Sequence, residues 1–261
     1  MESGLSALDW SGPWYAPWRV AGQAVAGRIA QGLAAHEALN RQAGPHPVRF
    51  VPQQALPADT AYERFVFEQR QCPTREGLHD FFNGLCWLHF PKAKRQLNAL
   101  QAAQIAAHGV GAVRGPLRDA ITVFDENGAL LDAPTPLWEA LAARQWRRLF
   151  IDLRPLWVQA RLVVFGHALL EKLAVPRKDL TAHVWHGPSP LGSMQAADAW
   201  LAAACTGERL AAKPFLHLPV LGVPGWWQAN ADAAFYDDAA VFRAARSRGG
   251  PLGGRPRAGH R

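Results

Sequence analysis

The spacing of apolar residues predicts helices through most of the chain. In six segments apolar positions recur every three to four residues, which places them on one face of a helix. Proline and glycine clusters, such as Gly44-Pro45-His46-Pro47, separate several of these segments. The helices predicted in this way span residues 18–42, 74–90, 92–108, 136–149, 155–174 and 193–206.

Strands are expected at fewer places. Short β-branched or aromatic runs bounded by proline predict strands at 48–51 and 62–69. A hairpin is predicted where 120–124 and 129–131 flank Asp125-Glu126-Asn127-Gly128, because Asn-Gly between apolar runs is a strong hairpin signal. The turn would account for both carboxylates without any catalytic role. The pattern as a whole predicts an α+β fold, predominantly helical, with a small antiparallel sheet.

Composition divides the chain into three parts. Residues 1–17 hold tryptophans among prolines and are expected to wrap over the domain in extended form. Residues 18–243 are predicted to form one globular domain, since the eleven tryptophans run from Trp10 to Trp227 and favour a single aromatic core. Residues 244–261 are rich in Arg, Gly and Pro, a composition typical of a disordered tail.

The net charge of +7 comes mainly from that tail. Six arginines and no acidic residue follow position 242, so residues 1–242 carry a net charge of only +1. A basic protein of this size would suggest nucleic-acid binding, but here the tail alone supports weak, nonspecific contact. Arginine outnumbers lysine 23 to 5 and alanine is abundant, which indicates a GC-rich bacterial genome.

Neither a disulfide framework nor a membrane span is predicted. The three cysteines, Cys72, Cys86 and Cys205, are widely spaced and form no C-x-x-C pair. The most apolar stretch, 156–175, contains two basic residues, one histidine and one glutamate, too many polar groups for a span. The N-terminus has no signal-peptide pattern, so a cytoplasmic protein with no membrane partner is expected.

The segment Gly77 to Phe90 carries the first candidate chemistry. Its apolar residues form one arc of a helix, and the opposite arc holds His79, Asp80 and Asn83 with a single charge. A solvent-facing arc would hold more charges, so we expect protein to cover both faces. These three residues then belong to a catalytic or binding site, or to a buried network that only orients the helix.

The next predicted helix supplies partners for these residues. Lys94 and Gln101 share a side with core-facing leucine and isoleucine, and Asn98 lies at the edge of that stripe. A lysine among core-facing residues needs a counter-ion, and Asp80 is the natural candidate. Alternatively, Lys94 extends its charged end to solvent past apolar neighbours.

His167 and Glu171 lie four residues apart in a segment, 157–173, that is apolar nearly all round. This spacing suits a His–carboxylate acid/base pair or a shared divalent metal, although zinc sites use three protein ligands and a core ion pair is the simpler interpretation. His183 and His186 are expected in a loop. No P-loop, dinucleotide-binding or nucleophile-elbow motif is present.

Five stretches together resemble a bacterial family of unknown function, the family numbered 3025 among such domains. The resemblance covers roughly residues 18–243 and implies that His79, Asp80, Asn83, Lys94, Asn98, His167, Glu171 and Trp226 lie in characteristic motifs. It implies no reaction, cofactor or partner. The stretches are H-D-F-F-N-G-L (79–85), F-P-K-A-K-R-Q-L-N-A-L-Q (90–101), T-V-F-D-E-N-G (122–128), V-F-G-H-A-L-L-E-K-L (164–173) and L-P-V-L-G-V-P-G-W (218–226).

Two functional hypotheses remain open at this stage. In the first, the six residues of the catalytic set (His79, Asp80, Asn83, Lys94, His167 and Glu171) converge in a pocket, with metal-assisted hydrolysis as the least specific chemistry they support. Asn98, Gln101 and Trp226 are then binding residues. In the second, the polar residues are scaffolding and the Trp226 segment binds a partner or ligand. A single shared site containing both His79 and His167 is the sharpest geometric expectation of the first.

Overall fold

The computed structural model describes residues 4–109 and 115–244 of the 261. Helices predominate and the sheets are small, so the predicted α+β, predominantly helical fold is confirmed. The helices are α1 (Arg19–Ala30), α2 (Ala35–Ala43), α3 (Tyr62–Gln69), α4 (Leu78–His89), α5 (Pro91–His108), α6 (Pro116–Asn127), α7 (Thr135–Ala142), α8 (His167–Lys172), α9 (Met194–Ala204) and α10 (Gly207–Ala211).

In the part of the chain that the structure describes, six strands form two sheets. The strands are β1 (Arg49–Pro52), β2 (Gln71–Thr74), β3 (Gly128–Asp132), β4 (Arg161–Val164), β5 (Thr181–His186) and β6 (Leu216–Pro219). β1 and β2 pair in parallel, and the larger sheet has the order β4-β3-β5-β6. In that sheet β3 runs parallel to β5, while both edge strands are antiparallel to their neighbours. The sheet is therefore mixed, not antiparallel as predicted.

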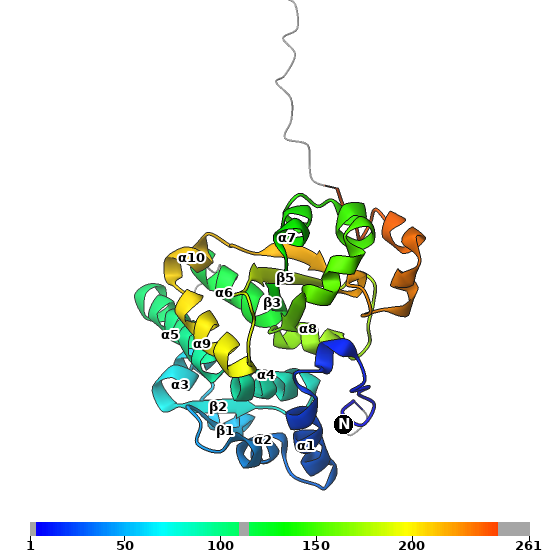
Figure 1. Cartoon of the computed structure of the whole chain (residues 1–261). Helices are drawn as coiled ribbons and strands as arrows, with labels where there is room; N and C mark the ends of the chain where they lie inside the picture. The colour runs from blue at the N-terminus through cyan, green and yellow to red at the C-terminus, as the bar shows by residue number, and fades with distance from the viewer. Residues whose placement is uncertain (1–3, 110–114, 245–261) are drawn as a thin grey trace, which may run out of the picture.

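The helices that matter for the site lie between these two sheets. α4 packs on α8, on α5 and on β2, and α6 packs on α8 and on the larger sheet. Figure 1 shows α4 and α8 in the middle of the molecule, with β1 and β2 below them and the larger sheet above. One continuous cluster of buried apolar side chains extends from Leu8 to Phe242. The single-domain assignment stays a prediction.

The predicted hairpin is wrong. Residues Pro116–Asn127 form α6 and only Gly128–Asp132 forms a strand. Ala120, Ile121 and Phe124 are buried at helical spacing, so the apolar run that suggested a strand is one helix face. Asn-Gly therefore marks a helix-to-strand junction, and a Cβ on Gly128 would overlap the Phe124 carbonyl and ring.

The central helix predicted at 155–174 is also wrong. It is replaced by a 3-10 turn (Arg154–Gln159), strand β4 and the short helix α8. The β-branched run Val163-Val164 pairs with Leu130 and Ala129 of β3, because the sheet satisfies its backbone groups there. The helix predicted at 136–149 ends at Ala142, and a π-helical turn follows at Arg148–Asp152.

Other boundaries differ at glycines and in short segments. The helix expected at 18–42 is two helices, because Gly32 at φ +94° turns the chain between α1 and α2. The helix expected from 74 begins at Leu78, after Gly77 at φ +136°. The run 62–69 is helix α3 instead of a strand, with Phe65 and Val66 buried, and α3 packs on α5.

The remaining expectations concern the chain ends and one loop. Residues 4–18 run through turns and a 3-10 helix (Pro13–Tyr15) instead of an extended path. His183 and His186 lie on β5, not in a loop. The tail expected at 244–261 lies, apart from its first residue, outside the described residues. Within the described ranges, no helix has the length and apolar character needed to cross a membrane.

Gly166 fixes the distance between α6 and α8. A Cβ at this position would overlap the backbone of Glu126 and Asn127 at the end of α6. Gly166→Ala is therefore expected to destabilise the fold by about 1–3 kcal/mol, the usual cost of overpacking. Urea unfolding would measure this, with Gly27→Ala as control, since Gly27 lies inside α1 with open space at its Cβ. Removing an exposed helix glycine is expected to stabilise by about 0.5–1 kcal/mol. If both substitutions changed the free energy of unfolding equally, the close approach of Gly166 to the end of α6 would be contradicted.

Candidate functional site

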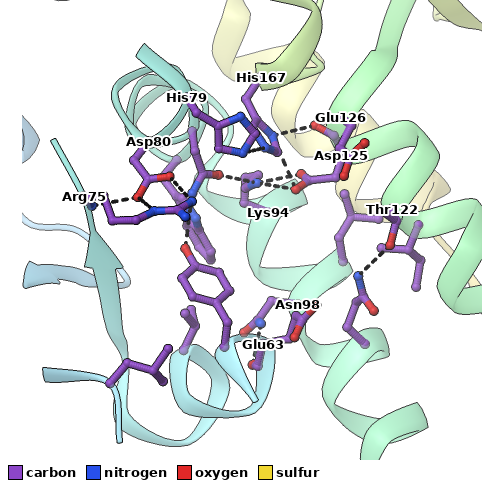
Figure 2. A pocket seen from close by; sticks show the side chains of 18 of the residues that line it. Glu63, Arg75, His79, Asp80, Lys94, Asn98, Thr122, Asp125, Glu126 and His167 are labelled. Carbon is purple, nitrogen blue, oxygen red and sulfur yellow. Dashed lines mark hydrogen bonds and ion pairs between the residues drawn. The ribbon is translucent and has the colours of Figure 1, made fainter. Parts of the chain in front are cut away.

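A cavity of about 450 Å³ lies among α3, α4, α5, α6 and α8. Histidines, carboxylates and Lys94 line it together with apolar side chains of Leu56, Val66, Leu97 and Ile121. Figure 2 shows His79, His167, Asp125 and Glu126 gathered at one end, with Asn98 and Glu63 at the other. Seven of the nine site residues predicted from the sequence line this cavity: His79, Asp80, Asn83, Lys94, Asn98, Gln101 and His167.

The two histidines meet at one end of the cavity. The Nε2 atoms of His79 and His167 are 3.2 Å apart, so the expected convergence of α4 and α8 is confirmed geometrically. His79 Nδ1 is 2.9 Å from Glu171 Oε2, which places Glu171 behind the histidine, outside the cavity wall. The side chain of His79 is 44% exposed and that of His167 only 8%. His79 is therefore the histidine that a ligand reaches.

His167 is held as a neutral, oriented ring. Its Nδ1 is 2.8 Å from the Asp125 carbonyl oxygen, which only accepts hydrogen bonds, so the proton of the ring is on Nδ1. Burial lowers the pKa of His167 to about 4; the Asp125 carboxylate opposes this, and the positive charge of Lys94 adds to it. The Nε2 lone pair of His167 consequently faces His79.

Lys94 and Asp125 form a buried ion pair beneath the histidines. Lys94 Nζ is 2.6 and 2.8 Å from the two carboxylate oxygens of Asp125, and it also donates to Asn83 Oδ1 at 2.9 Å. Burial, the largest single effect, would raise the pKa of Asp125, but the charge and hydrogen bond of Lys94 together with the two histidines outweigh it and lower that pKa. Only 5% of the Lys94 side chain is exposed, so the alternative in which it extends into solvent is wrong.

The predicted pairing of Lys94 with Asp80 is wrong as well. Asp80 accepts from the backbone N–H of Arg75 at 2.7 Å and from its guanidinium at 3.0 Å through both oxygens. The helix begins at Leu78, four residues later than predicted, so Asp80 lies in its first turn and faces the segment before it. The Arg75 side chain is 64% exposed and lines the cavity.

Asn83 links this ion pair to a buried hydroxyl. Its amide nitrogen donates to Tyr62 Oη at 3.2 Å, and Tyr62 Oη lies 3.1 Å from Cys72 Sγ. Burial raises the pKa of Tyr62 well above its usual value and that of Cys72 to about 11, so both stay protonated at neutral pH. Cys72 is consequently not an activated nucleophile.

The three residues predicted to bind a ligand are divided. Asn98 and Gln101 line the cavity; Asn98 donates to the Glu63 carbonyl at 2.7 Å, and Gln101 Oε1 is buried with no hydrogen-bond partner among the described residues. Trp226 is not part of the cavity wall, and its ring instead lies 6.2 Å from that of Trp14. The sequence grouping of Trp226 with the polar residues is therefore not reproduced in space.

Four residues of the site were not predicted from the sequence. Arg75 and Tyr62 were not considered, and Asp125 and Glu126 were assigned to a hairpin turn. The sequence carries a signal for Asp125: with 116–127 as a helix, Asp125 lies four residues after Ile121 and one after Phe124, beside their apolar stripe. The Asn127-Gly128 turn signal, which favours a hairpin, masks this helical position in the sequence.

The metal hypothesis is not supported by the arrangement of donors. Within residues 4–109 and 115–244, no three or more His, Cys, Asp or Glu side chains are grouped so that they could hold a metal ion. The His79–Glu171 and His167–Asp125 contacts each place two such groups together, and both histidines already use their inner nitrogens. Hydrogen bonds and ion pairs between the side chains hold the site together instead.

The fold and the site thus define an α+β protein with a histidine-containing polar pocket. The family model described as "Protein of unknown function (DUF3025)" matches residues 48–246. The chain belongs to this family, which confirms the resemblance seen in the five sequence motifs. The comparisons found no match among curated proteins and none among solved structures.

Proposed function

We propose that the cavity is the active site of an enzyme that hydrolyses a small polar substrate by general acid–base catalysis. The observation that carries this proposal is the partly exposed His79 ring, held between the Glu171 carboxylate and the neutral His167. A histidine that is both held in orientation and accessible to substrate is the most frequent general acid or base in enzymes.

The hydrogen-bond partners of the two histidines indicate which ring nitrogens carry protons. Glu171 accepts only, so His79 Nδ1 carries a proton. The Nε2 of His167 is a bare acceptor, because its Nδ1–H is given to the Asp125 carbonyl. The 3.2 Å contact between the two Nε2 atoms then needs a proton on His79 Nε2. In this arrangement His79 is an imidazolium whose positive charge is balanced by Glu171.

An acid and a base then face the same cavity. When substrate enters, the His79 Nε2–H turns from His167 Nε2 to the leaving group and is transferred to it, while Glu171 holds the ring through Nδ1. Glu126 lines the cavity and its carboxylate has no hydrogen bond or ion pair with the described residues, so it is free to take a proton from an attacking water. Two titratable groups with opposite roles are the common requirement for hydrolysis without a metal.

The electrophilic role falls to Arg75. Lys94 and Asn83 were the candidates from the sequence, but both use their polar atoms within the Asp125–Lys94–Asn83–Tyr62 network. Arg75 contacts Asp80 through Nε and one terminal nitrogen, which leaves the other terminal nitrogen for a substrate carbonyl or similar oxygen. Lys94 and Asp125 are positioning residues in this scheme.

We propose the cytoplasm of a bacterium as the setting of this reaction. All three cysteines are free thiols buried in the core. A reducing compartment maintains thiols in that state.

A competing candidate function is a non-catalytic binding module with the same polar residues as scaffolding. It is favoured by the fact that Lys94, Asn83 and Asp125 satisfy one another inside the protein. The two candidates differ in what His79 does. In a scaffold its loss destabilises the fold, and in an active site its loss removes activity and leaves stability nearly unchanged.

His79→Gln tests the proposed function. We expect wild-type protein to hydrolyse at least one of a set of chromogenic esters, phosphoesters, glycosides and anilides, and the variant to be at least about 100-fold slower, the lower end of general acid–base effects. Its melting temperature should stay close to that of wild type. His108→Gln is the control, since His108 is exposed at the end of α5, away from the cavity. A strongly lowered melting temperature in His79→Gln, or no wild-type hydrolysis of any substrate class, would favour the scaffold.

A further inference from the structure

A second site lies on the opposite side of α5 from the cavity. Lys94, Leu97 and Asn98 face the cavity, whereas Lys92, Arg95 and Ala99 line a separate hollow of about 560 Å³. At 100° per residue these two sets lie on nearly opposite faces of α5. The second hollow therefore belongs to no part of the proposed active site.

This hollow continues into a neighbouring one. The two share Pro47 and Arg70, and the neighbour, of about 350 Å³, adds Arg49 at the start of β1. We call the combined surface the α3–α5 groove. Its walls come from the end of α3, the beginning of α5 and the segment before β1.

The charge of the α3–α5 groove has one sign. Arg49, Arg70, Lys92 and Arg95 line it and all four are exposed, while no aspartate or glutamate among the described residues lines either hollow. None of the four forms an ion pair with a described residue. The nearest acid on α9, Asp198, is buried and accepts from the backbone of Lys92 and Ala93. Four unpaired cations in a concave surface attract an anion with several charges.

An exposed aromatic ring lies in the same groove. Among the described residues four large apolar side chains are exposed, and Phe67, at 41%, is the only aromatic one. Phe67 and Arg70 line the same hollow, so the ring and the cation lie near each other at the end of α3. Cations that follow a phosphate backbone, together with an aromatic ring on which a base stacks, are the two elements of single-strand recognition.

We infer that the α3–α5 groove binds single-stranded nucleic acid, with the four cations on phosphates and Phe67 stacked on a base. An acidic protein surface would use the cations but would not need the exposed ring. A duplex would not offer unstacked bases to Phe67. The groove is separate from the arginine-rich tail, whose weak contact with nucleic acid is a property of composition alone.

The test is fluorescence anisotropy of the full chain with labelled 12-nucleotide oligouridine, oligothymidine and a 12-base-pair duplex, across a salt series. The double variant Lys92→Gln/Arg95→Gln should reduce the salt slope of log K by about 1.4, since each phosphate contact of a single strand contributes about 0.7. Phe67→Ala should weaken single-strand binding at least about fivefold and leave duplex binding nearly unchanged. Tighter binding of oligouridine than of oligothymidine by the wild-type chain would identify RNA as the preferred strand.

Two controls separate the groove from charge in general. Arg147→Gln/Arg148→Gln makes the same charge change at exposed positions that line neither hollow, and it should bind as wild type does. Replacing the arginines at 246, 248, 255, 257 and 261 with glutamine tests the tail. The inference is overturned if both groove variants bind like wild type, if the Arg147/Arg148 control loses as much, or if only the tail variant loses binding.

Discussion

Replacing Lys94 with methionine is expected to destabilise the fold by about 3–5 kcal/mol, the usual cost of removing one partner of a buried ion pair. Lys94 is the counter-ion of Asp125 and also donates to Asn83. Methionine fills a similar volume, so the loss measures the charge and not a cavity. At about 2–4 °C per kcal/mol for a domain of this size, the melting temperature should fall by about 10 °C.

The double variant Lys94→Met/Asp125→Leu separates the ion pair from packing. With both charges removed, we expect most of the lost stability to return, because no unpaired charge is left inside the fold. Lys92→Met is the matched control: it makes the same change two residues earlier on the exposed face of α5 and should alter stability by less than about 0.5 kcal/mol. A double variant as unstable as Lys94→Met would show that the pair is not the cause.

Lowering the pH from 7 to 4.5 is expected to remove about 2–3 kcal/mol of stability through His167 alone. Burial lowers the pKa of this residue to about 4 in the folded protein, and the pKa returns to its ordinary value of 6.5 on unfolding. Between these two values the unfolded chain binds the extra proton, so the free energy of unfolding falls as the pH falls. Each unit of difference is worth about 1.4 kcal/mol.

Urea unfolding of wild type and His167→Gln at several pH values measures this contribution. The variant should lose about 2–3 kcal/mol less than wild type between pH 7 and 4.5. His183→Gln is an independent reference. Burial also lowers the pKa of His183 to about 4, so this variant should likewise lose less stability than wild type, although His183 lies on β5 outside the cavity wall. If wild type and His167→Gln show the same pH dependence, His167 is not the buried neutral ring described above.

The sequence by itself predicted that polar residues on α4, α5 and α8 meet, and the structure brings them together around one cavity. A helix with His79, Asp80 and Asn83 opposite a continuous apolar arc has too few charges for solvent, so protein has to cover both faces. The same argument applied to His167, although the long helix assumed around it is a strand followed by a short one. The prediction for His167 and Glu171 needed only that both lie on a helix, one turn apart, and α8 meets that condition although it is short.

Only the tertiary structure decided which charges pair. Lys94 is bonded to Asp125 and not to Asp80, because α6 is a helix that brings its last turn onto α5 and α8. The hairpin signal of Asn127-Gly128 is local, and it was overridden by burial of Ile121 and Phe124 against neighbours distant in sequence. Likewise, Arg75 reaches Asp80 only because Gly77 turns the chain before α4. Periodicity specifies what each segment buries, whereas the partner of a buried charge depends on which segments the fold brings together.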